Sequence, residues 1–212
     1  MQAQALLFDM DGTLIDSGEA IQIAWRNWAA RYGLEAGEIY DFSHGRKAVA
    51  TIEHFAPTGI DIEGDADTFH SDIAANVDKI SAIPGAKELL TSLRDGDWAV
   101  VTSATQDLAK TSLIAAGLPL PKLIIGAGQV SRSKPDPEGF LLGARGLGVE
   151  PSQVVVFEDA EAGLKAGRAA GAKLIGVGHF HHLKPLADHW VTDLRGIEIR
   201  RDNGLHLSLP EA

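Results

Sequence analysis

Two aspartates stand two residues apart directly after a short apolar run near the N-terminus. The run covers residues 5–8, and Asp9 and Asp11 follow it with Met10 between them. Because alternate side chains of an extended segment point the same way, both carboxylates can face one site. Two nearby carboxylates repel, so such a site needs a cation, a shared proton or hydrogen-bond donors. The spacing alone fits a turn or a helix cap equally well.

Further polar residues follow two other apolar runs. Thr102, Ser103 and Ala104 end one run and precede a helical pattern, where hydroxyls and free N–H groups can bind a phosphate. Glu158 and Asp159 end another run. Each group alone is also typical of a helix cap.

A lysine lies between these two groups in the sequence, where Lys134 precedes Pro135. Because ligands bind beyond the carboxyl ends of parallel strands, all of these residues are expected at one edge of a sheet. Oxygen ligands from Asp9, Asp159 and a backbone carbonyl suit Mg²⁺. Lys134 and the Thr102 hydroxyl suit a phosphoryl group. The combination predicts a site for phosphoryl transfer.

The elements that must position these residues alternate between short apolar runs and helical patterns. This alternation is typical of an α/β fold with a doubly wound, Rossmann-like parallel sheet. Strands are predicted at 5–8, 98–102, 123–126, 154–157 and 174–177, with a weaker edge strand at 190–194. Helices are predicted at 87–93, 106–117, 138–148 and 161–171.

Two segments depart from the alternation. Residues 18–83 contain amphipathic helical patterns at 21–33 and 47–55 but no buried strand. We interpret 18–83 as an inserted helical cap domain, so that 1–17 and 84–212 form the core domain. The last segment, 197–209, alternates apolar and polar residues around an Asn-Gly pair, which predicts a C-terminal hairpin with a type I′ turn or a near variant.

Composition and charge exclude several classes of function. The net charge of −10, from 19 basic and 29 acidic residues, argues against a nucleic-acid or membrane-surface partner. The chain contains no cysteine, which excludes disulfides and thiolate chemistry. No apolar segment fits a signal peptide or a membrane span. We expect a cytoplasmic monomer that binds a small molecule.

Four segments, in this order, resemble the motifs of the haloacid dehalogenase-like (HAD) superfamily. They are FDMDGTLIDS, VVTSAT, SKPDPEGF and VFEDAEAGLKAG. The similarity spans almost the whole chain and implies a core with a helical cap inserted after the first motif. Within the superfamily, residues 41–57 and the fourth motif look most like glycerol-phosphate and 2-deoxyglucose-phosphate phosphatases.

The resemblance implies a role in substrate binding or chemistry for residues of the first two motifs. Asp9 would be the nucleophile that forms an aspartyl-phosphate. Asp11 would protonate the leaving alcohol and then activate water. Thr102, Ser103 and the adjacent Ala104 would bind phosphoryl oxygens.

The last two motifs would supply the positive charge. Lys134 would neutralise Asp9 and the phosphate. Mg²⁺ would be bound by the side chains of Asp9 and Asp159 and by the Asp11 carbonyl, with Glu158 as a direct or an indirect ligand.

Substrate choice is expected to depend on a polar cluster in the inserted segment. His44, Gly45 and Arg46 follow Ser43 there. Arg46 could pair with a phosphate or hydroxyls, and His44 could hydrogen-bond a polyol. In the alternative interpretation Ser43 caps the start of a helix and Arg46 lies on a solvated face.

Two other groups of side chains are expected to have no catalytic role. Trp25 and Trp28 lie three residues apart on one helical face and are predicted to be core. His179, His181 and His182 do not match the spacing of a structural zinc site, so an exposed loop is expected.

The sequence therefore predicts a Mg²⁺-dependent phosphatase that acts on small sugar or polyol monophosphates. Dehalogenases and phosphonate-cleaving enzymes of the superfamily lack the second aspartate, so Asp11 argues against both. A β-phosphoglucomutase-like phosphomutase shares every core motif and stays open. A non-catalytic phosphate-binding regulatory protein needs neither the helical insertion nor Asp11.

Overall fold

The first apolar run forms an inner strand of a six-stranded parallel sheet. A computed structural model describes residues 1–210. The strands are β2 (Ala5–Phe8), β5 (Trp98–Val101), β6 (Ile124–Ile125), β7 (Val154–Glu158), β8 (Lys173–Val177) and β9 (His189–Val191). Their order is β6-β5-β2-β7-β8-β9, and every neighbouring pair is parallel. The order reverses beside β2, as a doubly wound sheet requires.

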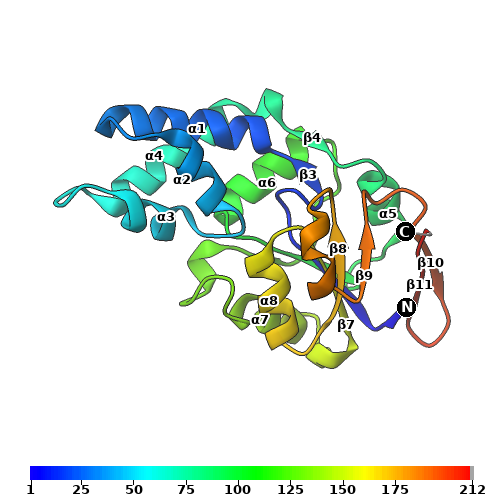
Figure 1. Cartoon of the computed structure of the whole chain (residues 1–212). Coiled ribbons are helices and arrows are strands. Elements are labelled where there is room, and N and C mark those ends of the chain that lie inside the picture. The colour runs from blue at the N-terminus through cyan, green and yellow to red at the C-terminus, as the bar shows by residue number, and fades with distance from the viewer. Residues whose placement is uncertain (211–212) are drawn as a thin grey trace.

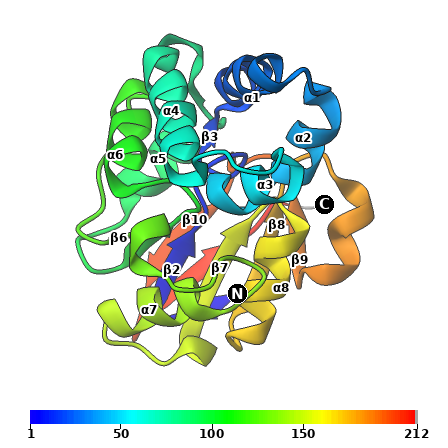
Figure 2. The same ribbon diagram turned by 90° about the vertical axis from the view of Figure 1, so that its left-hand side faces the viewer.

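Helices cover both faces of this sheet because its strands are apolar on both sides. The helices are α5 (Ala86–Ser92), α6 (Gln106–Ala115), α7 (Glu138–Gly146) and α8 (Glu161–Ala169). Leu6 and Phe8 pack in one cluster with Leu113 of α6, whereas Leu7 packs in another with Phe140 of α7. Figure 2 shows α7 and α8 in front of the sheet, with the C-terminal hairpin behind it. Short 3₁₀ turns are η1 (Val77–Lys79), η2 (Ala127–Gln129), η3 (Pro151–Gln153) and η4 (His181–Leu186).

Four helices form the segment between β2 and α5. They are α1 (Gly18–Tyr32), α2 (Ala36–Ser43), α3 (Ala48–Phe55) and α4 (Ile62–Ala75). Two short strands, β3 (Ile15–Asp16) and β4 (Ser81–Ala82), pair antiparallel where the chain enters and leaves this segment. Figure 1 shows α1–α4 gathered together at one end of the molecule. The helices predicted at 21–33 and 47–55 correspond to α1 and α3, whereas α2 and α4 were not predicted.

The interior of α1–α4 contains one charged side chain among aromatic rings. Trp25 and Trp28 are buried, as expected. The centroid of the Trp25 ring lies 4.0 Å from that of the Phe69 ring. Buried Asp65 accepts hydrogen bonds from Trp28 Nε1 (2.7 Å) and the Tyr32 hydroxyl (2.7 Å). These bonds compensate the loss of hydration that burial imposes on the carboxylate.

The C-terminal hairpin is confirmed and joins the N-terminus. Its strands are β10 (Glu198–Arg201) and β11 (Leu205–Ser208), and β11 also pairs with β1 (Gln2–Ala3). Arg201 pairs with Leu205, so the loop has three residues rather than the two of a type I′ turn. Asn203 adopts a φ of 48°, in the left-handed region that Asn tolerates. The α/β fold with its inserted helices and hairpin is thus confirmed, while the domain division at 17/18 and 83/84 stays a prediction.

Among the described residues no helix has the length and apolar character needed to cross a membrane.

Candidate active site

Asp9, Lys134 and Glu158 meet at the carboxyl end of β2. The Asp9 backbone N–H donates to Phe157 O (2.9 Å), which continues the β2–β7 pairing and fixes the start of the loop. Lys134 Nζ donates both to the Asp9 carboxylate and to Glu158 Oε2, the latter at 2.7 Å. The exposed fractions of Asp9, Lys134 and Glu158 are 5%, 8% and 0%. The three residues therefore form a charged cluster that is almost closed to solvent.

Glu158 is held on both carboxylate oxygens. Its Oε1 accepts the backbone N–H groups of Asp159 (3.1 Å) and Ala160 (3.0 Å), and its Oε2 accepts Lys134. Gly163 of α8 makes room for this side chain, because a Cβ at that position would overlap the Glu158 carboxylate. Glu158 is thus well placed to fix the position of the lysine.

Asp159 lies against the loop that carries the paired aspartates. The Thr13 hydroxyl donates to Asp159 Oδ1 at 3.4 Å. Gly12 adopts a φ of +81°, and a Cβ there would overlap the Asp159 carboxylate. The Asp-Gly-Thr sequence therefore allows the loop after β2 to approach the end of β7.

The donor set of this cluster fits a divalent cation. Carboxylate oxygens of Asp9, Glu158 and Asp159 lie within 4.8 Å of one another. All three carboxylates are buried, and Lys134 pairs with two of them, Asp9 and Glu158. Buried charges need compensation, so the cluster has room for a further cation. All-oxygen ligands of this kind suit Mg²⁺.

Burial dominates the electrostatics of the cluster. It raises the pKa of Asp9 well above the usual value; the charge of Glu158 adds to this effect and that of Lys134 opposes it. Burial, Glu158 and Asp9 raise the pKa of Asp159 in the same way. Burial lowers the pKa of Lys134, but the charges of Asp9 and Glu158 outweigh it and raise that pKa above its usual value.

Asp11 has a different environment from Asp9. Its Oδ1 accepts a hydrogen bond of 2.5 Å from Ser17, the residue before α1. Burial raises the pKa of Asp11, and the bond from Ser17 opposes this shift. The two carboxylates therefore have different hydrogen-bond partners: Asp9 accepts from a lysine, and Asp11 accepts from a hydroxyl.

The predicted phosphate-binding loop follows β5. The Thr102 hydroxyl accepts the Ala104 backbone N–H at 3.1 Å. Ser103 Oγ donates to the Gly45 carbonyl (3.0 Å), so this loop contacts the helical segment directly. Ser103 and Ala104 line the same cavity as Asp9, whereas Thr102 lines a smaller cavity of about 20 Å³ together with Lys134.

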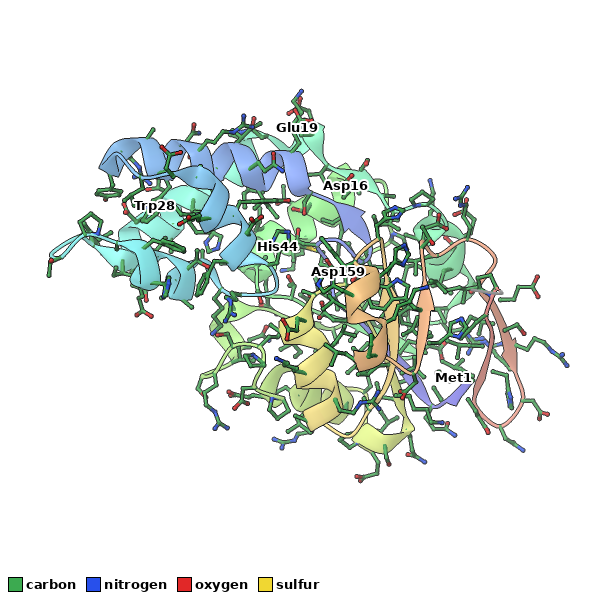
Figure 3. The ribbon with its side chains drawn as sticks, viewed as in Figure 1. Met1, Asp16, Glu19, Trp28, His44 and Asp159 are labelled. Atoms are coloured by element: carbon green, nitrogen blue, oxygen red, sulfur yellow. The ribbon has the colours of Figure 1, made fainter. Side chains whose placement is uncertain are left out.

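A cavity of about 220 Å³ lies between this edge of the sheet and the helical segment. Asp9, Asp11 and Asp159 line one side, and His44 and Arg46 line the other. Figure 3 shows His44 and Asp159 close together, at the junction of the helical segment and the sheet. The structure thus brings the cluster predicted for substrate choice to the same cavity as the paired aspartates.

The interpretation of Ser43 as a helix start is wrong. Ser43 ends α2, and its hydroxyl donates to the Tyr40 carbonyl (2.7 Å). Gly45 has a φ of +71°, and a Cβ there would lie only 3.0 Å from the Ala160 side chain. A glycine is therefore required where the segment after α2 passes close to the core. Arg46 donates to the Phe42 carbonyl (3.0 Å) and stacks on the Phe42 ring.

Several residues at the site were not predicted from the sequence. Ser17 binds Asp11, and Lys47 Nζ donates to the Val130 carbonyl (2.8 Å), a second contact between the helical segment and the core. Trp25 and His70 line the cavity although they lie on α1 and α4. Ser17 is the last residue of the first motif, so its place at the site could have been predicted from the sequence. The position of His70 could not, because it depends on how α4 packs.

The histidine-rich loop is exposed, as expected. His179, His181 and His182 are all on the surface. Within residues 1–210, the group of side chains that could hold a metal is the buried carboxylate cluster. Phe180 of this loop lines the cavity and lies 6.1 Å from the His44 ring, so the loop forms part of the cavity rim.

Three proteins with similar sequences are named as phosphatases of small phosphate esters. Hexitol phosphatase A of Escherichia coli K12 is 41% identical, over 84% of each chain. Glycerol-1-phosphate phosphohydrolase 2 of Saccharomyces cerevisiae is 38% identical, over 84% of this chain and 75% of the relative. 2-Deoxyglucose-6-phosphate phosphatase 1 of the same yeast is 33% identical, over 95% and 92%. These matches confirm the predicted resemblance.

A solved structure and a family model agree with this similarity. The β-phosphoglucomutase of Clostridium difficile has a TM-score of 0.78 and 25% identity, and the alignment covers 91% of this chain and 92% of the mutase. The model of haloacid dehalogenase-like hydrolases matches residues 6–177. This range includes most of β2, the whole helical segment and all four motifs. The chain belongs to the haloacid dehalogenase-like hydrolase family.

Proposed function

We propose that this chain is a Mg²⁺-dependent phosphatase that hydrolyses small sugar or polyol monophosphates through an aspartyl-phosphate. The observation that carries the proposal is the pairing of buried Asp9 with Lys134 beside a cavity that Asp11 also lines. An anionic nucleophile, a cation and a separate acid–base group are the components that hydrolysis by covalent catalysis needs. The phosphatase relatives support the same chemistry.

In the first step, a carboxylate oxygen of Asp9 forms a bond to phosphorus as the bond from phosphorus to the ester oxygen breaks. Asp11 donates a proton to the departing oxygen, which leaves as a neutral alcohol. In the second step, Asp11 takes a proton from water, and the water oxygen attacks phosphorus. The bond between phosphorus and Asp9 then breaks, which releases inorganic phosphate and restores the carboxylate.

The remaining core residues bind and orient the phosphoryl group. Lys134 offsets the charge of Asp9 and the phosphate, and Glu158 holds the lysine in place. The loop after β5, with Thr102, Ser103 and Ala104, supplies hydroxyl and N–H donors to phosphoryl oxygens.

The carboxylates of Asp9 and Asp159 and the Asp11 carbonyl would hold Mg²⁺, with Glu158 as a direct or an indirect ligand. When bound, the ion supplies positive charge that offsets the charge of the phosphoryl oxygens.

The helical segment is proposed to act as a cap over this site. Residues 18–83 would form the cap domain, and 1–17 with 84–212 the core domain. His44, Gly45 and Arg46 would contact the leaving group, because they line the cavity opposite the paired aspartates. The expectation of a cytoplasmic monomer stays a prediction.

The proposal is tested by inorganic phosphate release from purified protein with a panel of sugar and polyol monophosphates. We expect release with Mg²⁺, loss of release with chelator, and no release by Asp9→Asn. Folded, metal-loaded protein that releases no phosphate from any compound would contradict it.

A phosphomutase is the second candidate, favoured by the structural similarity to β-phosphoglucomutase. A mutase would convert one isomer of a hexose phosphate to another when a sugar bisphosphate is supplied. Product analysis by nuclear magnetic resonance separates the two activities, since a phosphatase yields free sugar and inorganic phosphate.

A further inference from the structure

One turn of the helical segment, residues 44–46, lies against two loops that follow strands of the sheet. The Gly45 carbonyl accepts a hydrogen bond of 3.0 Å from Ser103 Oγ, in the loop after β5. A Cβ at Gly45 would lie 3.0 Å from the Cβ of Ala160, which follows Asp159 after β7. The backbone at Gly45 is therefore close both to the predicted phosphate-binding loop and to the loop that carries a predicted metal ligand.

The contact with Gly45 uses the hydroxyl of Ser103. A serine hydroxyl carries one hydrogen, so it donates one hydrogen bond at a time, and here that bond goes to the Gly45 carbonyl. The Thr102 hydroxyl, in contrast, accepts the Ala104 backbone N–H (3.1 Å), which leaves its own hydrogen for a phosphoryl oxygen. The Thr102 side chain and the backbone of this loop are thus suited to bind phosphate, whereas the Ser103 side chain has a different task.

The position of the 44–46 turn depends on contacts of this kind. The chain enters and leaves the helical segment through β3 and β4, which are only two residues long. A second hydrogen bond, from Lys47 Nζ to the Val130 carbonyl (2.8 Å), joins the segment to the core two residues after Gly45. Hydrogen bonds at residues 45 and 47 therefore help to set how closely the turn approaches the paired aspartates on the other side of the cavity.

We propose that Ser103 is a positioning residue whose bond to Gly45 holds the 44–46 turn over the site of phosphoryl transfer. This inference rests on the proposed function, which places the leaving group beside His44 and Arg46. Through this bond, the loop that binds the phosphoryl group and the turn that contacts the leaving group move as one unit. The two ends of a phosphate ester are then held at a fixed separation, which favours an aligned attack by Asp9.

The kinetic test compares two substrates with different leaving groups. The leaving group of sorbitol 6-phosphate is a long polyol that the 44–46 turn can contact, whereas acetyl phosphate releases only acetate. Ser103→Ala is expected to lower kcat/KM for sorbitol 6-phosphate about three- to tenfold, the usual effect of losing one neutral hydrogen bond, and to change that for acetyl phosphate less than about twofold. Ser103→Thr keeps the hydroxyl and is expected to restore most of the loss.

Ser71→Ala is the matched control for this comparison. It removes a hydroxyl from an exposed serine of α4, whose hydrogen bond goes to the Asp67 carbonyl of the same helix (2.8 Å). Neither substrate should be affected. Equal losses for both substrates in Ser103→Ala would make the hydroxyl a direct phosphate ligand and overturn the proposal. Unchanged kinetics with both substrates would overturn it as well.

A distance measurement tests the position of the helical segment without any turnover. The chain contains no cysteine, so nitroxide labels attach only where Glu53→Cys in α3 and Glu150→Cys before η3 introduce one. Both glutamates are exposed. Double electron–electron resonance then gives the distribution of distances between the helical segment and the core. Ser103→Ala is expected to widen this distribution toward longer distances, and Ser103→Thr to leave it unchanged.

This measurement also separates the inference from the proposed function. A wider distribution in Ser103→Ala supports the positioning role even if the wild type releases no phosphate from any compound, a result that would contradict only the phosphatase proposal. Identical distributions in labelled protein with and without Ser103→Ala would overturn the positioning role.

Discussion

Lys134 Nζ lies 2.7 Å from Glu158 Oε2 and also bonds to Asp9, so one lysine joins two carboxylates that are almost closed to solvent. Removing one partner of a buried ion pair leaves charge without compensation, at a cost of about 3–5 kcal/mol. We therefore predict that Lys134→Ala lowers the free energy of unfolding by about that amount and abolishes detectable turnover. Urea unfolding and phosphate release measure the two effects.

Lys122→Ala is the control, since its pair with Asp95 is exposed and contributes at most about 1 kcal/mol. Equal stability of both variants would contradict the prediction.

Gly163 makes room for Glu158, so Gly163→Ala should disturb the same cluster. The added methyl group would overlap the Glu158 carboxylate. We expect a destabilisation of about 1–3 kcal/mol, typical of overpacking, and a lower kcat because Lys134 loses its fixed position. Gly37→Ala is the matched control, since Gly37 is exposed in α2 with no atom near the added methyl group. That change should stabilise the protein by up to about 1 kcal/mol. A Gly163→Ala protein with unchanged kcat would show that Glu158 does not position the lysine.

Asp65 should stabilise the helical segment through its hydrogen bonds. Asp65→Ala leaves the buried Trp28 Nε1 without an acceptor and removes the bond to Tyr32, so we predict a loss of about 2–4 kcal/mol. Asp65→Asn keeps one acceptor oxygen and should lose less. Urea unfolding of Asp65→Ala, Trp28→Phe and the double variant measures the coupling between the two residues. Additive losses would contradict the hydrogen bond as the cause.

The contact between Asp97 and Arg201 should make stability depend on pH in the acid range. Burial raises the pKa of Asp97, but two kinds of contact outweigh this effect and hold that pKa below its usual value. The Asp97 carboxylate accepts hydrogen bonds from the Arg201 side chain and the Arg94 backbone N–H, and both arginines add positive charge nearby. A carboxylate with a lowered pKa in the folded state stabilises the protein above its unfolded pKa of about 3.9. This stabilisation is lost as the pH falls through the folded pKa.

We therefore expect Arg201→Ala to lower the melting temperature at pH 7, and the difference from the wild type to shrink as the pH falls below about 4. Thermal unfolding at several pH values measures the difference. A gap that stays constant down to the lowest pH at which the protein folds would exclude Asp97 as the titrating partner.

The sheet could be predicted because its strands are continuous apolar runs. Runs such as ALLF at 5–8 and VVVF at 154–157 have no polar face, which only a sheet covered on both sides allows. The turn of the hairpin was less predictable, because the Asn-Gly pair fits both a two-residue and a three-residue loop. The register of Arg201 with Leu205 selects the longer loop.

The helices α2 and α4 lack so clear a pattern. In α2, Ile39 is the buried residue, and α4 mixes Phe69 and Ile73 with many polar side chains. Asp61 caps α4 by accepting the Gly64 N–H, a signal that its sequence carries. Motif order predicted that Asp9, Lys134, Glu158 and Asp159 would lie together, and the structure places them together. Their roles stay predictions. Trp25 and His70 come together only through the packing of α1 on α4.

Phosphate release from sorbitol 6-phosphate is the most direct test of the proposed chemistry. The measurement uses wild-type and Asp9→Asn protein, with Mg²⁺ and with an excess of chelator. Release by the wild type with Mg²⁺ alone, together with a wild-type phosphoenzyme whose phosphoryl group mass spectrometry locates on Asp9, is the predicted result. Undiminished release by Asp9→Asn, or a phosphoryl group on another residue, would contradict the assignment of Asp9 as the nucleophile.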